Sequence, residues 1–231
     1  MLCIGHRGAM GHEPENTLRS IQKALSLGVD VVEVDVYNVE RRLVVIHDRD
    51  LGRTTNGTGY VEEYSFADLR ALDAGKGEKI PTLEEVFNTV NRQAVIDIEL
   101  KGNNTAELVV DLIREYLNQG WSWSDFIVSS FNHEELHQVK SICAEIKTGM
   151  LIYGLPWRYL AILQQLRAEV LIASIDFVNP DLIASAHRLG VPVWIYTVNQ
   201  AKEIDRLRGL GVDGIVTNYP ERVLGSISNS H

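Results

Sequence analysis

The sequence predicts an α/β fold, namely a closed (β/α)8 barrel. Short β-rich runs alternate with amphipathic helical runs along the whole chain, which is typical of βα units around a parallel sheet. The 231 residues suit one such barrel, which commonly has about 200–250 residues. No Gly-x-Gly-x-x-Gly turn follows the first strand, and its absence disfavours an open, doubly wound sheet.

Eight runs rich in Val and Ile are the predicted strands. They span residues 2–6, 31–37, 94–100, 126–130, 148–153, 170–178, 191–198 and 214–217. Short β-branched runs bounded by turn residues are typical of buried strands. Several of these runs carry charged side chains near their C-terminal ends, where the reactive groups of a barrel collect.

Amphipathic segments between these runs are the predicted helices. They span residues 17–27, 106–117, 134–142, 159–166, 180–189 and 201–210. Gly28, Gly190 and Gly211 follow helices, where a left-handed residue commonly ends the helix. Pro180 and Pro220 stand where helices begin, at a position that proline favours.

One stretch interrupts the alternation after the second strand. That strand continues through residues 38–42 into residues 43–48 as a hairpin, and its tip lacks an Asp-Gly turn. A polar, Gly-rich segment, a short helix at 65–72 and a loop to Pro81 follow. We interpret residues 1–231 as a single barrel domain with a small insertion at about 48–80, which could cover or shape a site at the barrel mouth.

The composition limits the classes of function. Hydrophobic residues at 45% and charged residues at 23% are typical of a globular protein with an ample core. The net charge of −9 disfavours nucleic acid or an anionic membrane as a partner. No apolar run approaches the roughly 20 residues of a membrane span, and we expect no signal peptide, since the first predicted strand begins at Leu2. With only two cysteines and no disulfide framework, we expect a cytoplasmic protein.

Carboxylates occupy alternate positions on two predicted strands. Glu33 and Asp35 share one face of their strand, as do Asp97 and Glu99 on the next. Inward-facing carboxylates raise one another's pKa unless a cation lies between them. A hard divalent ion, Mg²⁺ or Ca²⁺, fits an oxygen ligand set of Glu33, Asp35 and Glu99. The alternative is a structural network of ion pairs, and Asp97, one pleat deeper, suits a structural role equally well.

Two histidines and two cations accompany these carboxylates. His6 and His47 both end strands, and a pair of imidazoles beside a metal can act as general base and general acid. Arg7 is suited to a bidentate grip on phosphate. Lys101 could bind the same anion or form a salt bridge with Glu99. These parts together predict metal-assisted cleavage of a phosphate ester.

Three further residues are candidates with structural alternatives. Trp194 and Tyr196 share a strand face and could form an aromatic wall for an alcohol or choline-like head group, or could simply fill the core. Asn16 lies in a turn before the first helix, which Asn16 or Thr17 caps. Asn16 could also contact His6 or the phosphate.

Eight short motifs of this chain, taken in order, resemble the glycerophosphodiester phosphodiesterase family. They are Gly5-His6-Arg7-Gly8, Pro14-Glu15-Asn16-Thr17, Glu33-x-Asp35, His47-Asp48, Arg53-x-Thr55, Ile80-Pro81-Thr82-Leu83-Glu84, Ile98-Glu99-Leu100-Lys101 and Asp213-Gly214-Ile215-Val216-Thr217. Each is weak alone, but the ordered set spans nearly the whole chain. Tyr196 and Asn218 depart from the family pattern, which more often has Trp and Asp there.

The resemblance implies a TIM barrel of the phospholipase-C-like phosphodiesterase type with an insertion after strand two. It also implies hydrolysis of glycerophosphodiesters, such as glycerophosphocholine or glycerophosphoethanolamine, to sn-glycerol 3-phosphate and an alcohol. By position, Glu33, Asp35 and Glu99 match the family's metal ligands and His6 and His47 its acid/base pair. Arg7 and Lys101 fall where the family contacts phosphate.

Two other functions are compatible with the same residues. A lyase resembling phosphatidylinositol-specific phospholipases would release a cyclic phosphate, but phospholipid substrates favour an apolar rim, and no stretch of the sequence suggests one. A non-catalytic metal-binding or ligand-binding barrel would require inert histidines. In each case the expected partner is a small molecule, without nucleic acid or a stable membrane anchor.

Overall fold

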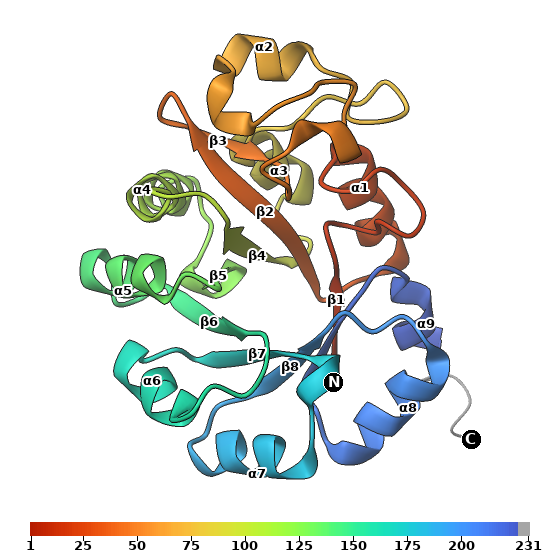
Figure 1. Cartoon of the computed structure of the whole chain (residues 1–231), viewed down its shortest axis with the longest axis vertical. Coiled ribbons are helices and arrows are strands. Elements are labelled where there is room, and N and C mark those ends of the chain that lie inside the picture. Colours follow the sequence, from red (N-terminus) through yellow and green to blue (C-terminus); the bar gives the residue numbers. More distant parts are fainter. Residues whose placement is uncertain (226–231) are drawn as a thin grey trace.

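Eight parallel strands close into a barrel within residues 1–225, which the computed structural model describes. The strands are β1 (Leu2–Gly5), β2 (Val31–Val39), β4 (Val95–Leu100), β5 (Phe126–Ser130), β6 (Lys147–Ile152), β7 (Val170–Ser174), β8 (Val193–Tyr196) and β9 (Gly214–Thr217). Their order around the sheet follows the chain, and β1 pairs with both β9 and β2. The predicted barrel is therefore confirmed, with the strands in the centre of Figure 1 and the helices around them.

Helices cover the outside of the barrel. They are α1 (Leu18–Leu27), α3 (Leu83–Val90), α4 (Ala106–Leu117), α5 (His133–Ile142), α6 (Tyr159–Leu166), α7 (Pro180–Arg188), α8 (Ala201–Leu210) and α9 (Pro220–Gly225). Gly28 and Gly211 end α1 and α8 with φ of 84° and 80°, as the sequence predicted. No helix in residues 1–225 combines the length and apolar composition of a membrane span.

Helix α3 was not among the predicted helices. Its N-terminus forms a capping box, in which the Thr82 side chain accepts from the Glu85 N–H and the Glu85 side chain accepts from the Thr82 N–H. Such reciprocal capping is readable from the sequence. The predicted strand at 170–178 was too long, because the Ser174 side chain accepts from the Asp176 N–H and starts a 3-10 turn, Ile175–Phe177.

The alternation of side chains along β2 separates two environments. Val32, Val34 and Val36 are fully buried in the main core between the barrel and its helices. Glu33 and Asp35 face the opposite way, into the barrel. A second apolar cluster, which includes Ile4, Val31, Ile127, Ile172 and Trp194, fills the barrel interior. Apolar side chains thus plug one end of the interior and leave charged ones at the other.

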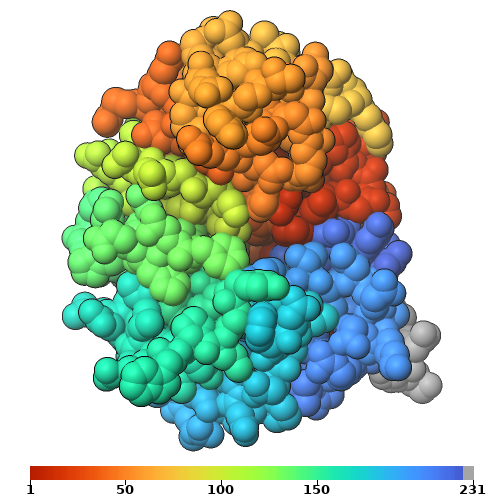
Figure 2. Space-filling model, viewed as in Figure 1, coloured from red at the N-terminus to blue at the C-terminus, as the bar shows by residue number. Residues whose placement is uncertain are grey.

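The insertion begins with an antiparallel hairpin. Strand β3 (Arg42–Val45) pairs with the end of β2, and the tip residues Glu40 and Arg41 have φ of 51° and 59°. Two consecutive left-handed residues are typical of a two-residue hairpin turn, so the hairpin forms without Asp-Gly. The segment that follows includes α2 (Phe66–Ala71) and packs around its own apolar cluster, which includes Leu51, Val61 and Leu69. Its orange atoms cover one end of the molecule in Figure 2.

Candidate active site

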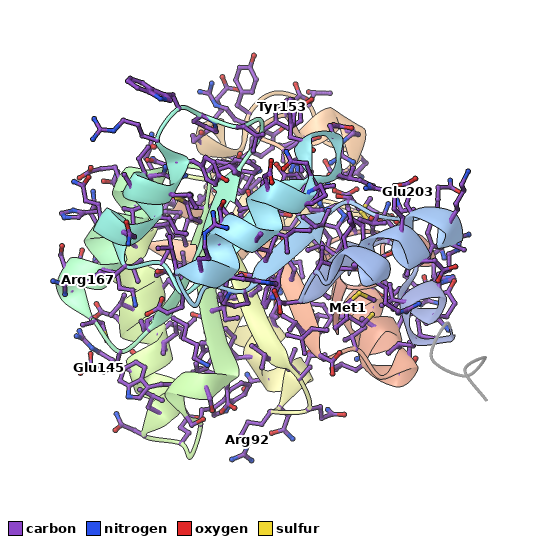
Figure 3. All side chains as sticks on the ribbon, turned by 90° about the horizontal axis from the view of Figure 1, so that it is seen from below. Met1, Arg92, Glu145, Tyr153, Arg167 and Glu203 are labelled. Atoms are coloured by element: carbon purple, nitrogen blue, oxygen red, sulfur yellow. The ribbon has the colours of Figure 1, made fainter. Side chains whose placement is uncertain are left out.

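A cavity of about 160 Å³ opens at the C-terminal ends of the strands. In Figure 3, Tyr153, which follows β6, lies at the opposite edge of the molecule from Arg92, which precedes β4. The cavity is lined by His6, Arg7, Glu33, His47, Asp97, Glu99, Lys101, Ser129, Phe131, Leu151, Ile172, Tyr196, Thr197 and Val216. All eight barrel strands, or the residues that follow them, contribute to this lining, because parallel strands bring their C-terminal ends together.

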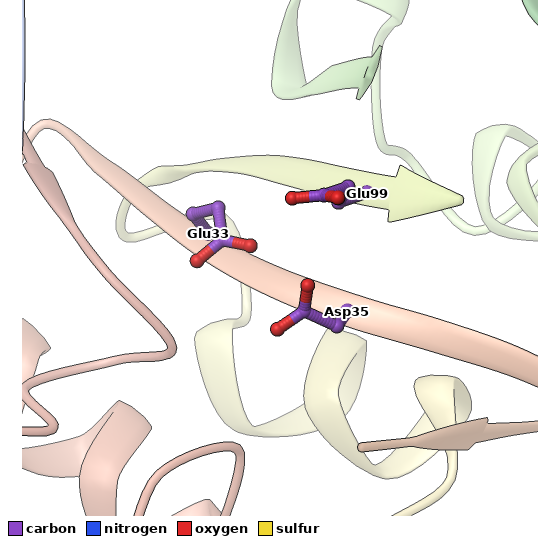
Figure 4. A group of neighbouring side chains, drawn as sticks. All are labelled: Glu33, Asp35 and Glu99. Carbon is purple, nitrogen blue, oxygen red and sulfur yellow. The ribbon is translucent and has the colours of Figure 1, made fainter. Parts of the chain in front are cut away.

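Three carboxylates converge beside this cavity. Glu33 and Asp35 project from β2, and Glu99 projects from β4 toward them (Figure 4). Each offers an oxygen within 4.8 Å of those of the other two. The register places Asp35 directly beside Glu99 and Glu33 beside Asp97. The alternate spacing in the sequence therefore becomes one buried acidic cluster.

This cluster fits a bound cation. Glu33 Oε1 and Asp35 Oδ1 are buried without a hydrogen-bond partner, which is costly for a carboxylate. Burial, followed by the neighbouring carboxylates, raises the pKa of Glu33 well above its usual range and that of Glu99 to about 7. Burial also raises the pKa of Asp97 to about 7. Oxygen ligands with unused lone pairs are what a hard divalent ion requires.

Residues from the first βα loop position two of these carboxylates. The Arg7 N–H donates to Glu33 Oε2 at 2.7 Å. The Asn16 side chain donates to Asp35 Oδ2 at 2.9 Å, and its own oxygen accepts from the Asp35 N–H. Asn16 is buried and lies outside the cavity lining. The structure thus gives Asn16 a contact with Asp35, and Asn218 is the partner of His6. A contact of Asn16 with phosphate stays a prediction, and Thr17 is the cap of α1.

The two cavity histidines have different partners. His6 Nδ1 lies 2.7 Å from Asn218 Oδ1, and His47 Nδ1 lies 2.5 Å from Asp48 Oδ1. Burial, with the Arg7 charge, lowers the pKa of His6 to about 4. Burial also lowers the pKa of His47, although Asp48 opposes this shift. Both Nδ1 atoms are thus engaged by acceptors, so the proton of a neutral ring resides on Nδ1 and Nε2 keeps a lone pair.

Two cations share the cavity with these groups. Lys101 Nζ lies 2.9 Å from Glu99 Oε1 and 3.2 Å from His47 Nε2. Arg7 Nη1 donates to Glu15 Oε1 at 2.6 Å, and its buried Nε has no hydrogen-bond partner. Nearby carboxylates raise the pKa of Arg7 and Lys101 despite burial. The salt bridge of Lys101 with Glu99 is therefore formed, and phosphate binding by Lys101, which lines the cavity, stays a prediction.

A network of ion pairs connects the insertion to the cavity. Arg53 donates two hydrogen bonds to Glu15, at 2.7 and 2.8 Å, and its Nε donates to Asp48. Glu15 in turn holds Arg7, and Asp48 holds His47. The sequence motifs contained these three residues, but sequence reasoning assigned no role to them, because their pairing depends on how the insertion folds back.

The two aromatic candidates of β8 lie in different surroundings. Tyr196 lines the cavity, and its hydroxyl donates to the Ile152 carbonyl at 2.9 Å. Trp194 is 2% exposed, belongs to the apolar cluster inside the barrel and does not line the cavity. The structure therefore favours the core-filling alternative for Trp194 over a substrate contact. It lies two residues deeper along the strand, where it packs against Gly214, at which any added Cβ would clash with its ring. Phe131, which was not predicted, lines the cavity instead.

The model of the glycerophosphoryl diester phosphodiesterase family matches residues 6–222 of this sequence. The chain belongs to this family. A glycerophosphodiester phosphodiesterase of Caldanaerobacter subterraneus subsp. tengcongensis is 34% identical over 245 residues, which cover 98% of this chain and 97% of that protein. A glycerophosphodiester phosphodiesterase of Bacillus subtilis (strain 168) is 30% identical and covers 96% and 84% of the two chains.

Solved structures give the same result. An Oleispira antarctica phosphodiesterase, solved in complex with the product sn-glycerol-3-phosphate, superposes with a TM-score of 0.90 at 30% identity, covering 98% of this chain and 96% of that one. The predicted family and barrel fold are confirmed. The chain is an enzyme of this family, a phosphodiesterase that acts on glycerophosphodiesters.

Proposed function

We propose that the chain is a single catalytic barrel domain with an insertion at about 48–80. It hydrolyses glycerophosphodiesters such as glycerophosphocholine and glycerophosphoethanolamine to sn-glycerol 3-phosphate and the free alcohol. The convergence of two histidines, two cations and an acidic cluster on one cavity carries this proposal. The product bound in the Oleispira antarctica phosphodiesterase supports it.

Glu33, Asp35 and Glu99 would hold one divalent cation, Mg²⁺ or Ca²⁺. When bound, such an ion supplies Lewis-acid polarisation of a phosphoryl oxygen, which commonly contributes several kcal/mol to transition-state stabilisation. The oxygen-only ligand set and the two buried carboxylate oxygens without partners support this assignment. Asn16 and the Arg7 N–H orient Asp35 and Glu33 for the same purpose.

Arg7 and Lys101 would bind the phosphate. Both side chains lie in the cavity lining with raised pKa values, so both are positively charged at neutral pH. Glu15, which accepts from Arg7 Nη1, and Asp35, whose Oδ2 lies 3.4 Å from Arg7 Nε, would hold this guanidinium in place beside the phosphate. These fixed charges would stabilise the negative charge that develops during the reaction.

His6 and His47 would transfer protons in two steps. In the first step one ring takes the proton of the glycerol 2-hydroxyl, whose oxygen forms a bond to phosphorus. The bond from phosphorus to the alcohol oxygen breaks, and the other ring protonates that oxygen. Water then opens the resulting cyclic phosphate with the two roles exchanged. The acceptors on both Nδ1 atoms direct the Nε2 lone pairs to this transfer, and Lys101 Nζ, 3.2 Å from Nε2 of His47, would have to release that atom when it binds the phosphate.

The negative net charge and the small cavity support a small-molecule substrate rather than nucleic acid. Cys3 and Cys143 are both buried and unpaired, which suits the reducing cytoplasm. These cysteines support a cytoplasmic location, which stays a prediction.

Release of sn-glycerol 3-phosphate from glycerophosphocholine tests the proposal. The wild type is assayed with Mg²⁺, with Ca²⁺ and with a chelator, beside His47→Ala and the control His187→Ala. His187 forms a similar pair with Asp213, at 2.8 Å, on the half-exposed surface. We expect metal-dependent release that His47→Ala loses by at least about 10²-fold and His187→Ala retains. Accumulation of a cyclic phosphate would indicate the lyase instead, and a folded protein without any release would contradict the proposal.

A further inference from the structure

A second cavity opens at the opposite end of the barrel, around the N-terminal ends of the strands. Its volume of about 450 Å³ exceeds the volume of about 160 Å³ of the active-site cavity. This lower cavity is lined by Leu2, Val31, Val95, Ser124, Ile127, Lys147, Glu169, Val170, Pro192, Trp194 and Asp213. Each of the eight barrel strands contributes one of its first two residues or the residue directly before it. The lower cavity is therefore a feature of the whole barrel and not of one loop.

The walls of the lower cavity are apolar. Val31, Ile127 and Val170 line it and belong to the apolar cluster inside the barrel. Ile172 belongs to the same cluster and lines the active-site cavity. Apolar side chains thus separate the two cavities, and no lining residue is common to both. A volume of about 300–1,000 Å³ with apolar walls and few polar groups is typical of a small-molecule site.

A hydrogen-bond donor without a partner contacts this cavity from the inside of the barrel. Trp194 is 2% exposed, and no group in residues 1–225 accepts from its indole N–H. This N–H is not among the polar atoms that are sealed in the core without a partner, and Trp194 lines the lower cavity, so the N–H faces that cavity. A buried indole N–H usually has an acceptor, and leaving it unpaired is costly. A ligand with an acceptor would satisfy it.

Three charged side chains line the lower cavity, and two of them are already paired. Glu169 pairs with Lys140 at 2.5 Å, and Asp213 pairs with His187 at 2.8 Å. The exposed Lys147 side chain forms no hydrogen bond or ion pair within the described part of the chain. The groups that still need a partner are thus a cation at the mouth and a neutral donor further inside. Both require acceptors, so the cavity favours an anion.

Strand register gives the separation of these two donors. Trp194 lies beside Ile172, which in turn lies beside Leu151. Leu151 is four residues beyond Lys147 on β6. At about 3.3 Å per residue, the backbones of Lys147 and Trp194 differ by roughly 13 Å in position along the strands. Their side chains span part of this separation, so a ligand that contacts both donors is elongated and has an acceptor at each end.

We propose that the lower cavity binds a small aromatic carboxylate that carries a second acceptor at its far end. The carboxylate accepts from Lys147, the ring packs against the apolar walls, and the far oxygen accepts from the Trp194 N–H. An aromatic ring suits this place because it is elongated and rigid and stacks on an indole. The proposal does not depend on the proposed catalytic function, since the two cavities have separate linings.

Calorimetric titration with 4-hydroxyphenylacetate tests the proposal, because its carboxylate and its phenol oxygen lie at opposite ends of one ring. Two analogues each change one end. Tyramine has an ammonium in place of the carboxylate, and 4-methylphenylacetate lacks the phenol oxygen. We expect a Kd below about 1 mM for 4-hydroxyphenylacetate and binding at least about threefold weaker for each analogue. Equal binding of either analogue, or no binding of 4-hydroxyphenylacetate, would overturn the proposal.

Variants show whether the ligand occupies the lower cavity. Lys147→Gln should weaken binding of 4-hydroxyphenylacetate at least about threefold. Lys202→Gln is the matched control, because Lys202 is exposed on α8, which follows the other end of β8, and it should not weaken binding. Phe131→Ser changes the active-site cavity and should also leave the Kd unchanged. Unchanged binding by Lys147→Gln, or loss of binding by Phe131→Ser, would overturn the proposal.

Trp194→Phe tests the inner contact separately. The variant keeps an aromatic ring but has no N–H, so it should bind 4-hydroxyphenylacetate and 4-methylphenylacetate with the same Kd. Its preference for 4-hydroxyphenylacetate over tyramine should remain, because Lys147 is unchanged. This second ratio also shows that the variant is folded and keeps the cavity. A variant that prefers the phenol as strongly as the wild type does would contradict the contact with Trp194.

Discussion

Nδ1 of each cavity histidine binds a neighbouring side chain, and these two side chains differ in charge. Asn218 presents a neutral amide oxygen to His6, and Asp48 presents a carboxylate to His47. Arg53 and His47 lower the pKa of Asp48 to about 2, so this carboxylate is charged throughout the neutral range. The two rings therefore lie in different electrostatic environments, which suits the proposed division into an acid and a base.

Substrates with different leaving groups should separate the two roles. A p-nitrophenyl ester of glycerol phosphate has a leaving group that needs no proton, so loss of the general acid should matter little. We expect His6→Ala and His47→Ala each to lose at least about 10²-fold on glycerophosphocholine, and one of them, not both, to recover most of that loss on the p-nitrophenyl ester. Steady-state rates of both variants on both substrates provide the check. Recovery by both, or by neither, would contradict the division of roles.

Asp48 should act by positioning His47. In Asp48→Asn the charge that faces Nδ1 is lost, and Arg53 loses one of its two partners. We expect kcat to fall about tenfold or more while KM changes less than threefold, because the phosphate contacts are untouched. Asp205→Asn is the control, since Asp205 also pairs with an arginine, Arg208, but on the surface of α8. A fall in kcat/KM that comes from KM alone would point to substrate binding instead.

At the scale of elements, the site depends on loops that are held from the outside of the barrel. Glu135 on α5 is 4% exposed and caps the start of α4. Its carboxylate accepts from the N–H groups of Asn104, Thr105 and Ala106 and from the Thr105 hydroxyl, at 2.9–3.1 Å. These residues end the loop that begins at Lys101, so one buried carboxylate fixes the loop after β4.

Loss of this carboxylate should destabilise the fold. Glu135→Ala leaves three buried or part-buried N–H groups without their acceptor, and we expect the free energy of unfolding to fall by about 2–4 kcal/mol. Urea unfolding followed by circular dichroism measures the change. Glu134→Ala on the same helical turn is exposed and should change stability by less than about 0.5 kcal/mol. Equal effects of the two substitutions would show that the capping contacts contribute little.

At the scale of the whole molecule, the acidic cluster makes stability depend on pH and metal. In the metal-free protein, burial raises the pKa of Glu99 and Asp97 to about 7, above the values of 4.5 and 3.8 expected when unfolded. The folded state then binds more protons than the unfolded state between these limits, so the free energy of unfolding falls as pH rises. This stabilising contribution is complete below about pH 4 and lost above about pH 7.

A divalent ion should offset that loss. We expect Mg²⁺ or Ca²⁺ to raise the melting temperature more at pH 8 than at pH 5.5. At pH 8 the carboxylates are ionised, so they attract the ion, and the ion relieves the repulsion between them, which is greatest at this pH. Thermal unfolding with chelator and with each metal, at both pH values, measures this. Glu33→Gln should lose most of the metal-induced shift. A shift that is equal at the two pH values would contradict a metal site built on these carboxylates.

Much of the fold was readable from the chain. Seven of the eight barrel strands agree with their predicted ranges to within two residues at each end, because β-branched runs and turn residues mark them locally. The strand that ends at Ser174 was predicted too long, since a side-chain cap replaces the strand where the apolar run continues. Helix α3 was missed although Thr82 and Glu85 carry a readable capping box.

The sequence by itself determined the family, the barrel and the types of groups in the cavity, because charged residues two apart on β-branched runs must share one face of a strand. Only the tertiary structure decided which of these side chains meet. It paired Asn16 with Asp35, connected Arg7 to His47 through Glu15, Arg53 and Asp48, and buried Trp194 below the cavity. Such contacts depend on strand register and on how loops fold back, and local sequence patterns do not encode either.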